Sequence, residues 1–255
     1  MRYSLFKCFG GKFYLADFII SNFPEHKIYV EPFCGGGTVL LRKNPSEIEI
    51  INDIDSGIIS IFESVKNDCN NFLEKLSQIE YCKENFTKAL NNEFDKPINE
   101  FILRRMSRSG MKKNFSWSER LRGGQVGDVN AWQNAIKNIP LTSKRLQNVK
   151  IYNKPAIEII KIYNNENVLL YCDPPYLHET RVSKNVYDYE MNRQEHIELA
   201  EELNDFKGKV VLSGYESNLY NQLYKNWNKI EKSIVNHSSQ QKKKSLKKEV
   251  LWIKY

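Results

Sequence analysis

Short apolar runs alternate with amphipathic stretches along the chain, and this alternation predicts an α/β fold. Short strand-like apolar segments lie near residues 28–32, 48–52, 149–152, 168–172 and 209–212. Apolar residues at helical spacing occur over 13–23 and over most of 56–106. Strands that alternate with helices indicate a mostly parallel sheet that binds its ligands at the carboxyl ends of the strands.

Two further features predict how the chain is divided. Strand-like segments near 229–235 and 249–254 flank a lysine-rich loop, which is typical of an antiparallel hairpin at a sheet edge. Residues 56–148 are mainly helical, with glycines and basic residues clustered after residue 101. We therefore expect one core domain from residues 1–55 and 149–255, and a smaller helical subdomain from residues 56–148.

Composition limits the class of protein. The chain has 255 residues, 41% of them hydrophobic, and a net charge of +7, which suits a polyanionic partner but also occurs in lysine-rich proteins without one. It has no apolar run of about 18 residues and no signal-peptide pattern, so we expect a cytoplasmic protein without membrane contact. The five cysteines lack metal-type spacing, which predicts reduced thiols and no metal site.

The hexapeptide Tyr171–Tyr176, Tyr-Cys-Asp-Pro-Pro-Tyr, is the most informative local sequence, and it directly follows an apolar strand. The prolines remove backbone donors, so the turn offers the Asp173 carboxylate and the Pro174 carbonyl as acceptors for an NH₂ group. Tyr176 supplies a flat ring on which a nucleobase can stack. The alternative is an ordinary strand exit closed by a Pro-Pro turn, because Asp and Pro are common turn residues.

A glycine-rich segment predicts a cofactor site. Gly35, Gly36 and Gly37 stand where a strand leads into a helix, which lets the backbone approach a ligand closely. Asp53 ends the next strand, 18 positions after Gly35. In nucleotide-binding α/β folds an acidic residue about 20 positions on binds the ribose hydroxyls. No later partner glycine follows, so adenosine without a pyrophosphate is the better ligand.

Basic residues are concentrated in two places. Arginines and lysines between residues 101 and 150 are interleaved with aromatic residues and methionines, a composition that suits a DNA-binding surface; the candidates for contact are Arg105, Arg108, Lys112 and Asn114. Lys242, Lys243 and Lys244 lie in the lysine-rich loop and are candidates for phosphate contact. Solvated basic loops are the alternative for both regions. His178, His196 and His237 are left out of the site, and His196 is expected to be solvated.

Four motifs in order resemble those of the Dam-like DNA adenine-N6 methyltransferases, in the alpha arrangement of amino-methyltransferases. They are Lys7–Lys12 (Lys-Cys-Phe-Gly-Gly-Lys), Glu31–Gly37 (Glu-Pro-Phe-Cys-Gly-Gly-Gly), Asn52–Asp55 (Asn-Asp-Ile-Asp) and Tyr171–Tyr176. Segments 121–125, 212–217 and 236–237 further resemble the phage and prophage branch. The resemblance covers nearly the whole chain. It implies a class I S-adenosylmethionine-dependent methyltransferase fold, with residues 56–148 recognising the DNA target.

The resemblance also implies roles for individual residues. Asp173 and Pro174 would accept hydrogen bonds from the N6 amine of an adenine extruded from duplex DNA, and Tyr176 would stack on that base. S-adenosylmethionine would contact Cys8, Lys12, Phe33, Gly35, Asp53, Ile54 and Asp173. Better-known members carry Trp where this chain has Cys8, so an aromatic contact is lost or supplied elsewhere, for which Tyr3 and Phe9 are candidates.

Alternatives to adenine methylation in DNA stay open from the residues alone. One is methyl transfer to another amine, such as cytosine N4, RNA adenine or a glutamine amide; Asp173 favours a nucleobase over the amide. The other is a catalytically silent nucleic-acid-binding protein. We also expect a monomer, with a cognate restriction endonuclease as a further candidate partner. The sequence does not determine the DNA recognition site.

Overall fold

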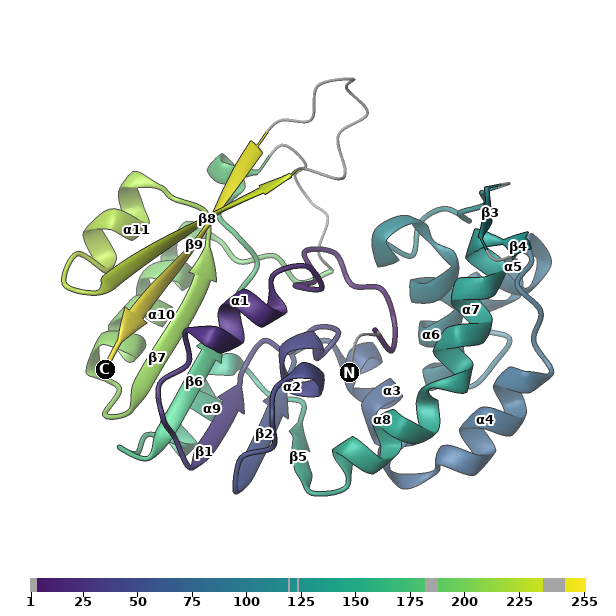
Figure 1. Ribbon diagram of the computed structural model, residues 1–255, viewed down its shortest axis with the longest axis horizontal. Coiled ribbons are helices and arrows are strands. Elements are labelled where there is room, and N and C mark those ends of the chain that lie inside the picture. Colours follow the sequence, from purple (N-terminus) through teal and green to yellow (C-terminus); the bar gives the residue numbers. More distant parts are fainter. Residues whose placement is uncertain (1–3, 119, 123, 182–187, 236–245) are drawn as a thin grey trace.

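The computed structural model describes residues 4–118, 120–122, 124–181, 188–235 and 246–255. Its central element is a seven-stranded sheet in the order β5-β2-β1-β6-β7-β9-β8 (Figure 1). These strands are β1 (Ile28–Glu31), β2 (Ile48–Asn52), β5 (Val149–Tyr152), β6 (Val168–Cys172), β7 (Lys209–Gly214), β8 (Asn228–Val235) and β9 (Leu246–Lys254). The first five in spatial order pair in parallel, and β9 pairs antiparallel with both β7 and β8. The predicted mostly parallel sheet and its antiparallel hairpin are confirmed.

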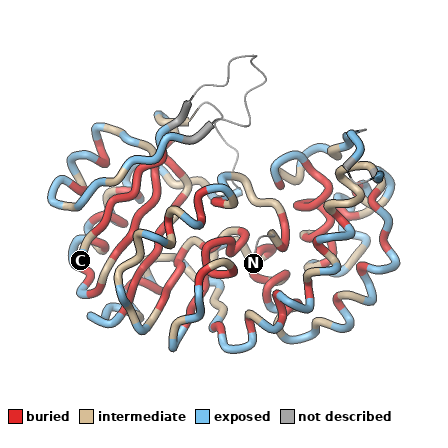
Figure 2. The backbone as a smooth tube through the Cα atoms, viewed as in Figure 1, coloured by how far each residue is buried: buried red, intermediate tan, exposed pale blue. Residues whose placement is uncertain are grey.

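The middle strands of the sheet are buried on both faces. Val30 of β1 is in register with Ile50 of β2 and with Leu170 of β6. Every residue of β6 is buried, which explains why its sequence is a continuous apolar run rather than an alternating one. Because β1, β2 and β6 are adjacent and parallel, their carboxyl ends bring the segments that follow them to one edge of the sheet. Figure 2 shows the central part of the sheet as buried.

Two hydrophobic cores lie on the two faces of the sheet. Leu169 and Tyr171 of β6 face one core, whereas Leu170 and Cys172 face the other, as alternation along a strand requires. The first core contains α1 (Ala16–Ser21), α2 (Thr38–Arg42) and α3 (Ser56–Asn67). The second contains α9 (Ala156–Ile162), α10 (Arg193–Asp205) and α11 (Asn218–Leu223). Helices therefore cover both faces.

Residues 56–148 fold into helices that lie to one side of the sheet (Figure 1). After α3 come α4 (Cys69–Ser77), α5 (Lys83–Leu90), α6 (Lys96–Met106), α7 (Gly127–Lys137) and α8 (Ile139–Leu146). A short 3₁₀ turn, η1 (Arg108–Gly110), follows α6, and a hairpin of β3 (Leu121–Arg122) and β4 (Gln125–Val126) precedes α7. A second 3₁₀ turn, η2 (His178–Thr180), follows β6.

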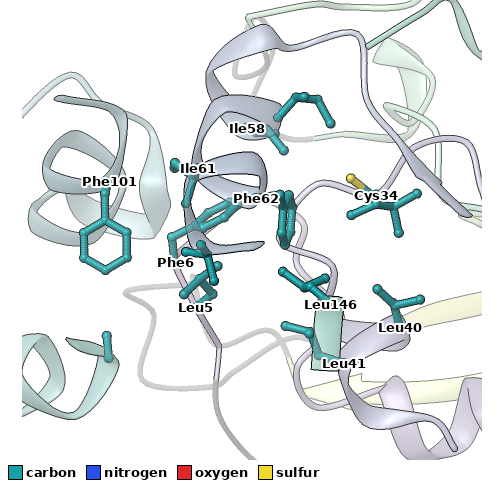
Figure 3. Packing of buried hydrophobic residues seen from close by; sticks show 14 of the residues in the cluster. Leu5, Phe6, Cys34, Leu40, Leu41, Ile58, Ile61, Phe62, Phe101 and Leu146 are labelled. Atoms are coloured by element: carbon teal, nitrogen blue, oxygen red, sulfur yellow. The ribbon is translucent and has the colours of Figure 1, made fainter. Parts of the chain in front are cut away.

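The helical region and the sheet share one continuous core. Figure 3 shows this core around α3, with side chains from the N-terminal segment, α2, α3, α6 and α8: Leu5, Phe6, Leu40, Leu41, Ile58, Ile61, Phe62, Phe101 and Leu146. Phe6 and Phe62 meet edge to face with ring centroids 5.5 Å apart. The N-terminal segment is thus fixed between the sheet and the helices, which places residues 8–12 beside the carboxyl ends of the strands.

Candidate active site at the carboxyl ends of the strands

A cavity of about 500 Å³ lies at the carboxyl ends of β1, β2 and β6. Its walls come from the N-terminal segment, the glycine-rich loop, the end of β2 and the turn after β6. All the residues predicted to contact the cofactor line this cavity: Cys8, Lys12, Phe33, Gly35, Asp53, Ile54 and Asp173. This volume lies within the range of pockets that enclose a small molecule or cofactor. The tertiary structure thus brings together motifs that are up to 165 residues apart.

The glycine-rich loop forms one wall of the cavity. Gly35 adopts a φ of +47°, a left-handed conformation that favours glycine, and a Cβ there would lie 3.3 Å from Sγ of Cys8. The Gly35 amide donates a hydrogen bond to Oδ2 of Asp53 at 2.8 Å. Burial raises the pKa of Cys8 to about 11, so Cys8 is an uncharged, space-filling side chain beside the loop. Phe9 also lines the cavity, whereas Tyr3 lies outside the described residues.

Asp53 is held as an acceptor at the end of β2. Its Oδ1 accepts from the amide of Asp55 at 3.0 Å, and its Oδ2 accepts from Gly35. Burial raises the pKa of Asp53 to about 6, and the two backbone hydrogen bonds oppose that rise. The carboxylate is therefore ionised at neutral pH, and each oxygen keeps a lone pair for a further donor such as a hydroxyl.

Asp173 follows β6 and pairs with Lys12. The Lys12 Nζ lies 2.7 Å from each oxygen of the carboxylate, with hydrogen-bond geometry at Oδ2. Oδ1 is buried and makes no hydrogen bond within the part of the chain that the structure describes. Burial raises the pKa of Asp173, although the Lys12 ammonium opposes this. The Lys12 ammonium neutralises the carboxylate, but Oδ1 has no hydrogen bond of its own, so it is suited to accept from a bound donor.

Pro174 and Tyr176 are both buried, and neither lines the cavity. Tyr176 is 6% exposed, and its hydroxyl donates to Oε1 of Glu249. The rings of Tyr176 and Tyr215 pack in a T-shaped arrangement at a centroid distance of 4.7 Å, and the Lys12 ammonium lies 4.9 Å from the centroid of Tyr176. Because Tyr176 is almost fully covered by its neighbours in this structure, a base could stack on its ring only if neighbouring side chains move.

Two buried carboxylates at the site, Glu31 and Glu249, were not predicted from the sequence. Glu31 ends β1 and lines the cavity, and the Tyr29 hydroxyl donates to its Oε2 at 3.1 Å. Burial raises the pKa of Glu31 to about 8. Glu249 lies on β9 at the other end of the chain. Glu31 stands within the glycine-rich motif and could have been found there, whereas nothing in the local sequence around Glu249 indicates a site.

The predicted DNA-binding residues differ in their surroundings. Arg108 and Asn114 are exposed. Lys112 lines the cavity and pairs with Asp188 at 2.6 Å. Arg105 is only 8% exposed, and its guanidinium donates to the backbone carbonyls of Ser4 and Ala131. The prediction that Arg105 lies on a DNA-binding surface was wrong, because this side chain is buried and anchors the N-terminal segment to α6 and α7. Lys242, Lys243 and Lys244 lie outside the described residues.

Other expectations concern residues away from the cavity. His196 is fully buried, and its Nδ1 lies 2.9 Å from the Tyr220 hydroxyl, so the expectation that it is solvated was wrong. Its helix turns this residue inward together with Leu199 and Leu203. All five cysteines are free. Within the described residues, no cluster of three His, Cys, Asp or Glu side chains could hold a metal ion, and no helix is long and apolar enough to cross a membrane.

Comparison with known proteins identifies the family. The sequence profile of the D12 class N6 adenine-specific DNA methyltransferases matches residues 9–240. The chain belongs to this family. It is 28% identical to the type II methyltransferase M.MjaIII of Methanocaldococcus jannaschii, with 86% of each chain covered. It is 24% identical to the DNA adenine methylase of Escherichia coli K12, over 92% of this chain and 90% of that one.

Family membership confirms the central predictions from the sequence. The protein is an enzyme that methylates the N6 amine of adenine in DNA, using a methyl donor. This decides against a silent binder and against the other amine substrates. The seven-stranded sheet with its antiparallel pair agrees with the class I methyltransferase fold. The closer resemblance to the phage and prophage branch stays a prediction.

Proposed function

We propose that the methyl donor is S-adenosylmethionine, and that the protein transfers its methyl group to an adenine extruded from duplex DNA. The observation that carries this proposal is the buried Oδ1 of Asp173, an acceptor without a hydrogen bond in the described structure, at the wall of a cavity lined by all the predicted cofactor residues. A paired adenine cannot reach that acceptor from within a duplex, so the base must leave the stack.

The cavity suits S-adenosylmethionine in charge and shape. Asp53 offers both oxygens to the ribose hydroxyls, and Ile54 lies next to it to pack on the adenine ring. A side chain at position 35 would meet Cys8, whereas glycine lets the backbone approach the ligand closely. The ionised carboxylate of Asp53 and the Asp173 carboxylate on the wall favour a ligand that carries positive charge. When bound, S-adenosylmethionine would supply a methyl group already attached to a good leaving group.

Asp173 and Pro174 would prepare the amine of the target base for reaction. The lone pair of adenine N6 is delocalised into the ring, which makes the nitrogen a poor nucleophile. If the Asp173 carboxylate and the Pro174 carbonyl accept its two hydrogens, the nitrogen becomes more pyramidal and its lone pair is directed toward the methyl group. Tyr176 would stack on the base after its neighbours move aside.

We also propose that residues 56–148 recognise the DNA target. Arg108 and Asn114 are exposed after α6, and Trp117 and Leu121 are exposed close by, the latter on the β3–β4 hairpin. Figure 1 shows this hairpin at the tip of the helical region. Exposed basic and polar side chains suit contact with phosphates and base edges. A monomeric state and a cognate restriction endonuclease stay predictions.

Asp173→Ala tests the proposed active site. We expect it to reduce methyl transfer more than about a thousandfold, because it removes a principal acceptor for the reacting amine. Mass spectrometry of nucleosides from DNA incubated with the purified protein and S-adenosylmethionine measures N6-methyladenine directly. The matched control is Asp95→Ala, which removes an exposed carboxylate that pairs with Lys75 at the surface and should stay within about twofold of wild type.

Retention of near-normal turnover in the Asp173→Ala variant would contradict the assignment. Loss of the folded state, monitored by circular dichroism, would be recognised separately from loss of chemistry.

A further inference from the structure

The ammonium of Lys12 occupies the position that the target amine is proposed to take. Its Nζ lies 2.7 Å from both oxygens of Asp173 and 4.9 Å from the centroid of the Tyr176 ring. An adenine N6 amine that donates to Asp173 while its base stacks on Tyr176 would need the same space. The lysine must therefore withdraw from Asp173 before the target base can bind productively.

Lys12 is 6% exposed, so its charge cannot simply be released into water. A buried charge that loses its partner without gaining another is strongly disfavoured. Any movement away from Asp173 therefore needs a second counter-ion within reach of the ammonium.

Glu249 is the carboxylate that satisfies this requirement. It is 2% exposed, and its Oε1 lies 3.8 Å from Nζ of Lys12, so a small rotation of the lysine would bring the two groups to hydrogen-bond distance. The antiparallel pairing of β9 with β7 fixes its place, since the next residue, Val250, is in register with Gly214. The same Oε1 accepts from the Tyr176 hydroxyl. Glu249 thus contacts both groups that surround Asp173.

We propose that Glu249 is a positioning residue that accepts the Lys12 ammonium when the target amine displaces it from Asp173. The proposal rests on the proposed roles of Asp173 and Tyr176. No proton is transferred in this step, because the ammonium stays charged and only exchanges one carboxylate for another. The empty site is kept neutralised by Lys12, and the exchange frees Asp173 for the amine.

A binding experiment separates this role from a purely structural one. Two labelled duplexes carry the target site, one with adenine and one with purine, which lacks the amine and has no need to displace Lys12. Fluorescence anisotropy with the full-length protein and S-adenosylhomocysteine measures both affinities. Wild type should prefer the adenine duplex by about tenfold, the worth of a hydrogen bond to a charged acceptor. A wild-type protein without this preference would contradict the proposal.

Glu249→Gln removes the charge that receives the ammonium and keeps an acceptor for Tyr176. We expect the preference for the adenine duplex to fall below about twofold, while affinity for the purine duplex stays within about twofold of wild type. Glu249→Asp, which withdraws the carboxylate but keeps its charge, should lose part of the preference and is available if Glu249→Gln does not fold. Glu231→Gln is the control, because Glu231 lies on the neighbouring strand and pairs with the surface residues Lys229 and Lys248.

Tyr176→Phe distinguishes the two contacts of Glu249. If Glu249 acts only by holding the Tyr176 hydroxyl, Tyr176→Phe will abolish the adenine preference as fully as Glu249→Gln, and the proposal is wrong. If Glu249 receives Lys12, Tyr176→Phe will retain most of the preference. An adenine preference unchanged in both Glu249→Gln and Glu249→Asp also overturns the proposal.

Methyl transfer by Asp173→Ala in parallel assays separates failure of this inference from failure of the active site. If Asp173→Ala is inactive and the Glu249 variants bind like wild type, only the role of Glu249 fails. If Asp173→Ala remains active, the site itself is misassigned.

Discussion

At the scale of single residues, burial controls which carboxylates of the cavity are charged. Asp53 has a pKa of about 6 and Glu31 a pKa of about 8, both raised mainly by burial. At neutral pH Asp53 is therefore ionised, whereas much of Glu31 is protonated. The two backbone amides that donate to Asp53 oppose the rise in its pKa, and the ionised carboxylate can accept from ribose hydroxyls at neutral pH.

The pKa of Asp53 predicts how cofactor affinity depends on pH. Above pH 6 the carboxylate is ionised and can accept from both ribose hydroxyls; below pH 6 it is protonated in the free protein. The dissociation constant for S-adenosylmethionine should therefore rise as pH falls below about 6, by up to about tenfold per unit. Isothermal titration calorimetry from pH 5 to 8 measures this dependence.

Asp53→Asn is the matched control for that titration. It should weaken binding at pH 7.5 by about 1.5–3 kcal/mol, since charge-assisted hydrogen bonds are lost, and it should remove the change near pH 6. Unaltered affinity in this variant would place the ribose elsewhere, with Asp55 as the next candidate.

At the scale of secondary-structure elements, a buried ion cluster connects α8 to the sheet. The Arg145 guanidinium donates to both carboxylate oxygens of Glu49 on β2 and to the carbonyl of Leu40 at 2.9 Å. Lys43 pairs with the same Glu49 at 2.6 Å. Burial alone would raise the pKa of Glu49, but the hydrogen bonds from Arg145 and Lys43 outweigh it and lower the pKa. The last helix of the 56–148 region is thereby fixed to the sheet.

Arg145→Ala should destabilise the protein by about 3–5 kcal/mol, because it leaves a buried carboxylate with one of its partners missing. Urea denaturation at pH 7 measures the loss. The pKa of Glu49 is lowered in the folded protein, so its ionised form stabilises the fold at pH values above the usual pKa of a carboxyl group. The difference in unfolding free energy between Arg145→Ala and wild type should therefore shrink as pH falls and Glu49 is protonated. Lys154→Ala, in an exposed pair with Glu158, should cost less than about 1 kcal/mol. If Arg145→Ala also lowers the free energy of unfolding by less than about 1 kcal/mol, Lys43 alone is enough to stabilise the buried Glu49 carboxylate.

At the scale of the whole molecule, we propose that the cavity at the strand ends carries out the chemistry and that the helical region recognises the DNA target. The cavity lies at the strand ends, and the exposed residues Arg108 and Asn114 lie on either side of residues 110–112, which line it. Arg108→Ala or Asn114→Ala should change the preferred target site, because a base-edge contact contributes about 1–3 kcal/mol of discrimination. Methylation profiling of a randomised DNA library measures the preference.

Replacement of Lys242, Lys243 and Lys244 by Ala is the counterpart of those variants. We expect weaker binding to target and non-target DNA alike, with a smaller salt dependence and an unchanged site preference, because phosphate contacts carry no sequence information. If only the lysine variant changes the site preference, the lysine-rich loop reads the bases and the region around Arg108 and Asn114 contacts the phosphates. Arg105→Ala should instead reduce stability, since Arg105 is buried against backbone carbonyls.

The sequence by itself determined the fold class, the strand order along the chain, and the motifs that line the cavity. These are encoded locally: strand periodicity, a glycine-rich turn and the Asp-Pro-Pro-Tyr segment each lie within a few residues, and the parallel sheet then brings their ends together. The ordered motifs of the family also predicted the reaction, because each motif is a short contiguous segment that can be read without its neighbours in space.

Only the tertiary structure decided which side chains meet inside the site. Glu249 comes from β9, 76 residues beyond Asp173, and its place beside Lys12 and Tyr176 depends on strand pairing that the local sequence does not specify. Arg105 and His196 look like surface residues by type, but the packing of their helices turns them inward, where Arg105 donates to two backbone carbonyls and His196 hydrogen-bonds a tyrosine hydroxyl. Burial and long-range pairing are properties of the assembled fold, because they depend on which elements pack on either side of a residue.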